Sequence, residues 1–125
     1  MLDIQRDVER FMLAADQPVS RVPKITQSDQ ENLYMDLIAE EYAELVTAMS
    51  NNDIIESADA IADLIWVAIG LASTIGIPFD QVWEEVKRSN DSKIVDGTLM
   101  KNPETGKVMK PPTFSEPDLD PVLFP

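Results

Sequence analysis

The chain has 125 residues, a hydrophobic fraction of 44% and a formal charge of −13, values that fit one domain with a real core rather than two. It contains no cysteine and no histidine, which excludes disulfides, thiolate metal sites, cysteine nucleophiles and the usual imidazole base. The surplus of acids opposes binding to a phosphate backbone, so nucleic acid is not an expected partner.

The first predicted helix and the start of the second have clear boundaries. Apolar residues at the spacing of one helix face predict a helix near residues 2–15, ended by Pro18. Ser28 and Glu31 have the spacing of a capping box, and the run rich in Glu, Ala, Leu and Met that follows predicts a second helix as far as Met49.

The next elements follow a polar turn at residues 50–53. A third helix is predicted over residues 54–74, ending near Gly76, and it should form an antiparallel hairpin with the second. A fourth amphipathic helix is predicted from Pro78 to about Ser89. The fold class is therefore all-α, a four-helix bundle.

The last residues have a different composition. Residues 95–125 hold six of the nine prolines and a turn-like PETG at 103–106, so we predict an extended or looped tail in which one short hairpin can form. We expect a helical domain over residues 1–94, with the tail either part of that domain or of an oligomer interface.

Neither an export signal nor a membrane span is expected. Residues 1–11 carry charges throughout and have no apolar core of the signal-peptide type. The most apolar stretch, residues 64–77, is 14 residues long, whereas a bilayer span takes roughly 20. We expect a cytoplasmic protein without membrane contact.

Acidic residues are concentrated in the predicted hairpin. Between positions 25 and 86 there is no Lys or Arg, yet residues 29–63 include ten Asp or Glu residues. At roughly 100° per residue, Glu41 and Glu44 project on the apolar side of the second helix. These two acids are therefore not expected to face only water, although a solvated acidic face is the common alternative.

The third helix adds Glu56, Asp59 and Asp63. Asp63 is the one charged residue in an otherwise apolar run, where a lone carboxylate is costly unless it is paired or binds a cation. Two unit charges about 5 Å apart repel by roughly 3 kcal/mol at an effective dielectric of 20, so converging carboxylates need a cation. Oxygen ligands select a hard ion, which predicts Mg²⁺, with Mn²⁺ as a substitute.

Positive charge is concentrated near the other end of the chain. Six of the ten Lys and Arg residues fall between positions 87 and 110. Lys87 and Arg88 alone would be explained by the negative end of the fourth helix dipole. Together with a metal on the acidic hairpin, the segment 87–93 offers donors suited to phosphate oxygens, which points to a polyphosphate substrate.

Four segments of the chain resemble the all-α nucleotide pyrophosphohydrolases, a group that includes MazG-like enzymes, dimeric dUTPases, dCTP pyrophosphatases and phosphoribosyl-ATP pyrophosphohydrolases. The segments are E-E-Y-A-E at 40–44, A-D-A-I-A-D-L-I-W-V at 58–67, G-I-P-F-D-Q-V-W-E-E-V at 76–86 and K-R-S-N-D-S-K at 87–93. The resemblance covers about residues 30–110. It implies a MazG-like bundle that is a homodimer or homotetramer.

The resemblance also implies Mg²⁺ held by E-x-x-E on one helix and E-x-x-D on the next. The first pair corresponds to Glu41 and Glu44. If Asp63 is the aspartate of the second pair, the position three residues before it is an alanine, and Asp59 would have to substitute. Alternatively Glu56 and Asp59 form the second pair, with Asp63 behind the site. We favour Asp59 and Asp63.

The implied reaction is hydrolysis of a nucleoside triphosphate between its α- and β-phosphates, in a nucleotide-pool or house-cleaning role. Any of Glu40, Glu41 and Glu44 could activate the attacking water. By resemblance, Arg88 would contact the phosphates, and Asn90 and Lys93 the nucleotide. Two alternatives are phosphoribosyl-ATP as the substrate and a non-catalytic helical interaction module.

Overall fold

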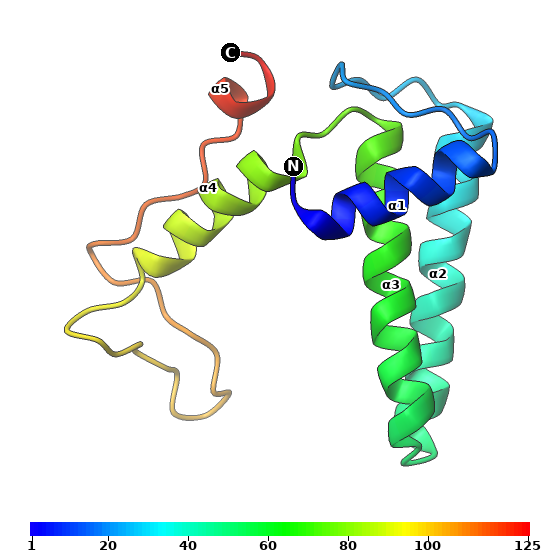
Figure 1. Cartoon of the computed structure of the whole chain (residues 1–125). Helices are drawn as coiled ribbons and strands as arrows, with labels where there is room; N and C mark the ends of the chain where they lie inside the picture. The colour runs from blue at the N-terminus through cyan, green and yellow to red at the C-terminus, as the bar shows by residue number, and fades with distance from the viewer. The chain divides into compact units, whose positions relative to one another are not determined.

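The computed structural model describes all 125 residues as five helices and no strand (Figure 1). The predicted all-α class is confirmed. Four of the helices are long, and their bounds are α1 Asp3–Ala14, α2 Asp29–Ser50, α3 Ile54–Thr74 and α4 Phe79–Asp91. All four lie within two residues of the bounds predicted from the sequence. The fifth, α5 (Asp120–Leu123), is a single turn that the sequence did not indicate.

The chain divides into two compact units. Met1–Phe79 contains α1, α2 and α3, and Asp80–Pro125 contains nearly all of α4, the tail and α5. By its contacts α4 therefore groups with the tail. The tail is largely extended and has two isolated antiparallel bridges, Val95 with Thr98 and Lys101 with Val108. No single helix of the chain is long and apolar enough to cross a membrane; α3 and α4 would meet such a criterion only as a pair, by length and composition.

Helix α2 begins at the predicted capping box. The Ser28 hydroxyl accepts a hydrogen bond from the Glu31 backbone N–H at 3.1 Å. The Glu31 carboxylate in turn accepts hydrogen bonds from the Thr26 hydroxyl at 2.7 Å and the Thr26 N–H at 3.0 Å. These bonds, those from Thr26 first, lower the pKa of Glu31 to about 2. The Glu31 carboxylate is therefore ionised at neutral pH.

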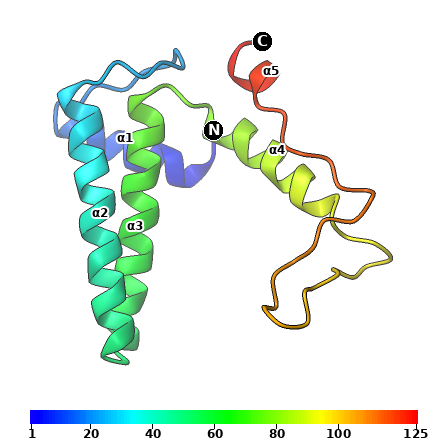
Figure 2. The ribbon, with the colours of Figure 1, turned by 180° about the vertical axis from the view of Figure 1, so that it is seen from behind.

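Helices α2 and α3 lie side by side along their whole length, joined by a short turn at residues 51–53 (Figures 1 and 2). Asp53 caps α3 by accepting a hydrogen bond from the Glu56 N–H at 3.1 Å. Near the other end of the pair, Tyr34 of α2 packs against Gly70 of α3. A Cβ atom at position 70 would lie 2.1 Å from the Tyr34 ring, so the close approach of the two helices requires glycine there.

The core lies at the end of the hairpin away from the turn, where α1 crosses the pair (Figure 1). Val8 and Met12 of α1 are buried there against Tyr34 of α2 and Val67 and Ile69 of α3. The other half of the hairpin is not covered by α1. Helix α1 therefore fixes one end of the α2–α3 pair.

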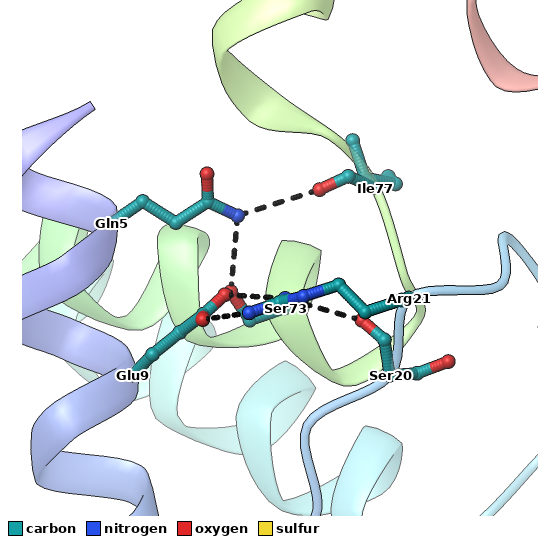
Figure 3. A network of polar contacts seen from close by, with 6 residues as sticks. All are labelled: Gln5, Glu9, Ser20, Arg21, Ser73 and Ile77. Atoms are coloured by element: carbon teal, nitrogen blue, oxygen red, sulfur yellow. Dashed lines mark hydrogen bonds and ion pairs between the residues drawn. The ribbon is translucent and has the colours of Figure 1, made fainter. Parts of the chain in front are cut away.

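A buried polar network strengthens the attachment of α1 (Figure 3). Glu9 of α1, whose side chain is 7% exposed, accepts a hydrogen bond from the Ser73 hydroxyl of α3 at 2.6 Å and one from Arg21 Nη1 at 2.9 Å. Gln5 donates to Ser73 Oγ at 3.2 Å and to the Ile77 carbonyl at 3.4 Å. One carboxylate thus links α1, the segment that follows it and α3.

Replacing Arg21 by Met should destabilise the chain by roughly 1–3 kcal/mol at neutral pH, because the buried Glu9 carboxylate loses its cation. Arg21 lowers the pKa of Glu9 from its usual 4.5, so the stabilisation is complete above that value and is lost as the pH falls through the lower folded pKa. Urea unfolding at pH 7 and at about pH 3 measures the free energy of unfolding of parent and variant. The difference between the two proteins should be smaller at about pH 3 than at pH 7.

The matched control is Arg10→Met, which breaks an exposed ion pair with Asp7. It should change stability by no more than about 0.5 kcal/mol. An equal loss of unfolding free energy in the two variants would contradict this role for Glu9. So would a loss for Arg21→Met that is as large in acid as at neutral pH.

Candidate active site

The acids predicted to form the site lie on the facing helices of the hairpin. Between α2 and α3 there is a groove of about 490 Å³. Five acidic residues line it: Glu40, Glu44, Asp53, Glu56 and Asp59. No Lys or Arg lines the groove. Its other lining residues are Ala43, Thr47, Ala48, Asn51 and Ala60.

Glu41 is the acid with the most unusual surroundings. Its Oε2 atom is completely buried and has no hydrogen-bond partner. Burial, the adjacent Glu44 carboxyl group and the negative charges of Asp63 and Glu40 together raise the pKa of Glu41 to about 7, with burial the largest cause. A cation that neutralises and coordinates an oxygen in this position would stabilise the ionised carboxylate.

Asp63 on α3 has the same kind of environment. Burial raises its pKa most, followed by the charges of Asp59 and Glu44 and a hydrogen bond with Asp59. The structure therefore brings Glu41 and Glu44 of α2 into electrostatic contact with Asp63 of α3, and Asp63 into contact with Asp59. The choice of Asp59 and Asp63 as a pair of metal ligands stays a prediction.

The remaining predicted acids lie at the edge of this cluster. Glu56 lines the groove but is not among the residues that shift the pKa of Glu41 or Asp63. Glu40 lines the groove and adds its charge to the field at Glu41. No three acids of the chain lie close enough together to hold a metal ion in this conformation.

The donor set nevertheless fits a hard divalent cation. All the candidate ligand atoms are carboxylate oxygens, no Lys or Arg lines the groove to neutralise them, and one oxygen is buried without a partner. The buried Ala60 lies between the acids of α3 and cannot bind metal. Residues Thr47, Asn51 and Asp53 were not predicted as part of the groove. Thr47 could have been found, because it follows Glu40 and Glu44 along the same helix face.

The three predicted substrate-binding residues lie in the unit Asp80–Pro125. Arg88 donates to the Glu85 carboxylate and, through Nη2, to the Glu116 carbonyl at 2.9 Å. Asn90 Oδ1 accepts a hydrogen bond from Lys93 Nζ at 3.2 Å. Arg88 is thus engaged within its own unit, whereas Lys93 forms no ion pair. Their contacts with substrate remain predictions.

Three aromatic side chains of the unit Met1–Phe79 are candidates for contact with a nucleobase. Phe11 and Trp66 pack edge to face, with ring centroids 5.6 Å apart, and Trp66 packs against the core. Tyr42 is 60% exposed on α2.

Comparison with known proteins identifies the family of this chain. The family model for phosphoribosyl-ATP pyrophosphohydrolase matches residues 8–90, a range that includes all the acids of the groove. The chain therefore belongs to this family, within the MazG-like all-α pyrophosphohydrolase superfamily. It is a pyrophosphohydrolase, a hydrolase acting on acid anhydrides, which disfavours the alternative of a non-catalytic module. No curated protein matches the chain.

In metal-free buffer, Glu41→Gln should stabilise the chain by roughly 1–2 kcal/mol at pH 8 and by little at pH 4. A folded pKa near 7, above the usual 4.5, means that the carboxyl is tolerated while protonated and becomes destabilising as the pH rises from 4.5 through 7. Glutamine mimics the protonated form at every pH. Chemical unfolding across this range measures the difference.

The exposed tail residue Glu104 provides the control, since Glu104→Gln should leave the free energy of unfolding unchanged within about 0.5 kcal/mol at every pH. A Glu41→Gln variant that is equally stable with the parent at pH 8 would show that Glu41 is an ordinary solvated acid.

Proposed function

We propose that the chain hydrolyses the anhydride between the α- and β-phosphates of a nucleoside triphosphate, releasing the monophosphate and pyrophosphate, with Mg²⁺ as cofactor and Mn²⁺ as a substitute. The observation that carries this proposal is the buried, unpartnered Glu41 oxygen in a cluster of carboxylates without a cation. Family membership supplies the reaction type.

Each acid has a proposed role. Glu41, Glu44, Asp59 and Asp63 would hold the metal, with Glu56 as an alternative partner of Asp59. When bound, Mg²⁺ supplies the positive charge that neutralises phosphate oxygens as the anhydride breaks. Because Glu40 lines the groove beside Glu41, we assign it to orient the attacking water and to accept its proton.

Phosphoribosyl-ATP is the second candidate substrate. It is favoured by the family model, whose description names that activity. Cleavage at the same α–β position would use the same carboxylates, so the groove supports both substrates equally. A dNTP substrate would fit a cytoplasmic role in controlling the nucleotide pool, with the phosphates reached by Arg88 and the nucleotide by Asn90 and Lys93.

The chain with Mg²⁺ should release pyrophosphate from at least one member of a panel of ribo- and deoxyribonucleoside triphosphates and phosphoribosyl-ATP. The double variant Glu41→Gln, Glu44→Gln should lose this activity by roughly 100-fold or more, because the metal loses half of its ligands. Coupled pyrophosphate detection measures both the activity and the preferred substrate.

Glu104→Gln again serves as the control and should keep full activity. Undiminished Mg²⁺-dependent release of pyrophosphate by the double variant would show that Glu41 and Glu44 take no part in the reaction. Preference for phosphoribosyl-ATP over every simple triphosphate would select the second candidate.

We also propose that the chain works as a homodimer or homotetramer. Several large apolar residues of the hairpin are more than 40% exposed, among them Tyr42 and Val46 of α2. At roughly 100° per residue, the exposed Ile54, Ile61 and Ile65 form one stripe on α3, on the side away from Asp59 and Asp63. An apolar stripe of this kind is typical of a subunit interface.

The double variant Ile61→Lys, Ile65→Lys should therefore have a smaller mass in solution than the parent, because buried lysines would oppose association. Light scattering after size-exclusion chromatography measures the mass. The control Asn32→Lys, at an exposed polar position of α2, should keep the mass of the parent. A parent chain that is already monomeric at micromolar concentration would contradict the oligomer.

A further inference from the structure

Two lysines of the unit Asp80–Pro125 share one aromatic ring. The ammonium group of Lys93 lies 5.5 Å from the centroid of the Phe114 ring, and that of Lys110 lies 5.1 Å from the same centroid. Lys93 is the second residue after the end of α4, whereas Lys110 lies in the tail. The fold thus brings together two cations that are 17 positions apart in the sequence.

The tail is fixed to the end of α4 by several hydrogen bonds. The Thr113 hydroxyl donates to the Ser92 carbonyl at 2.9 Å, and the Ser115 N–H donates to the Ser92 hydroxyl at 2.9 Å. Arg88 holds the Glu116 carbonyl at 2.9 Å. These bonds flank Phe114 on both sides in the sequence, so the position of its ring relative to Lys93 is set by the fold.

Neither lysine is neutralised by a carboxylate. Two other cations of this unit form ion pairs, Lys87 with Glu84 and Arg88 with Glu85, whereas Lys101 and Lys107 form none. Lys93 donates only to the amide oxygen of Asn90. An ammonium group has three donors, and contact with a ring face does not use all of them. Both cations therefore keep donors for an anion.

Because the chain as a whole is strongly negative, it can bind an anion only where cations are grouped locally. With a net charge of −13, the chain repels a polyphosphate, and only local clusters of cations can attract it. Lys93 and Lys110 together form such a cluster over the ring of Phe114. Lys93 and Lys110 are called the lysine pair below, and the aromatic ring that both contact is that of Phe114.

We propose that Lys110 is a second phosphate-binding cation, which acts with Lys93 on the polyphosphate chain of a nucleotide, and that Phe114 positions both ammonium groups. The assignment of the anion to the substrate rests on the proposed function. Lys110 lies outside the residues matched by the family model, so its role comes from the contacts of the tail alone.

Binding of inorganic tripolyphosphate in the presence of EDTA tests the lysine pair separately from the metal site. Without metal the acidic groove repels this probe, so any binding must come from cations. Isothermal titration should show that Lys110→Gln weakens binding by about 3- to 10-fold, the loss of one charge-assisted hydrogen bond at an exposed site. Lys107→Gln, which removes the same charge three residues away in the same tail, should stay within about twofold of the parent.

Steady-state kinetics give the second readout. For the nucleotide that the parent hydrolyses, Lys110→Gln should raise KM by about 3- to 10-fold and leave kcat within about twofold, because Lys110 binds the phosphates without activating water. Lys107→Gln should change neither constant.

The outcomes separate this proposal from the proposed function. If the parent hydrolyses nucleotides but Lys110→Gln binds tripolyphosphate as Lys107→Gln does, the lysine pair is not a phosphate site and the proposed function stands. If no nucleotide is hydrolysed but tripolyphosphate binding falls only in Lys110→Gln, the proposed function fails and the anion site stands. If the parent does not bind tripolyphosphate, the lysine pair is not an anion-binding site and the proposal is wrong.

Discussion

The repulsion among carboxylates on two facing helices is the constraint on which this account depends. Glu41 and Glu44 of α2 and Asp63 of α3 lie within each other's electrostatic field, and no Lys or Arg lines the groove beside them. A protein could relieve this repulsion by letting the acids turn to water, but one Glu41 oxygen is completely buried and has no partner. The arrangement is unfavourable for the chain alone, and the divalent cation of the proposed function would relieve the repulsion.

The rest of the unit Met1–Phe79 keeps these helices in place. The capping box at Ser28 and Glu31 fixes the start of α2, and the contact of Tyr34 with Gly70 sets how closely α2 and α3 approach. The buried Glu9 carboxylate attaches α1 to one end of the pair. Stability is therefore concentrated at the end of the hairpin away from the turn, and the acids lie beyond it, where strain at a functional site is offset by packing elsewhere.

Local signals explain which parts of the structure could be predicted from the sequence. The bounds of the four long helices follow from caps, glycines and prolines within a few residues of each boundary, and the inward direction of Glu41 follows from helical periodicity. The network of Glu9, Arg21 and Ser73 joins residues up to 64 positions apart, and no local pattern indicates it. The same holds for Lys93 and Lys110 over Phe114, because only the returning tail brings them together.

Titration calorimetry of Mg²⁺ binding at pH 8, on the parent and on Glu41→Gln, tests the central claim most directly. If the buried Glu41 oxygen is a metal ligand, the parent binds Mg²⁺ with displacement of the residual proton on Glu41, and the variant binds at least about tenfold more weakly. Equal Mg²⁺ affinity in the two proteins, or no binding to the parent, would contradict the account, because the carboxylates would then have to be tolerated without a cation.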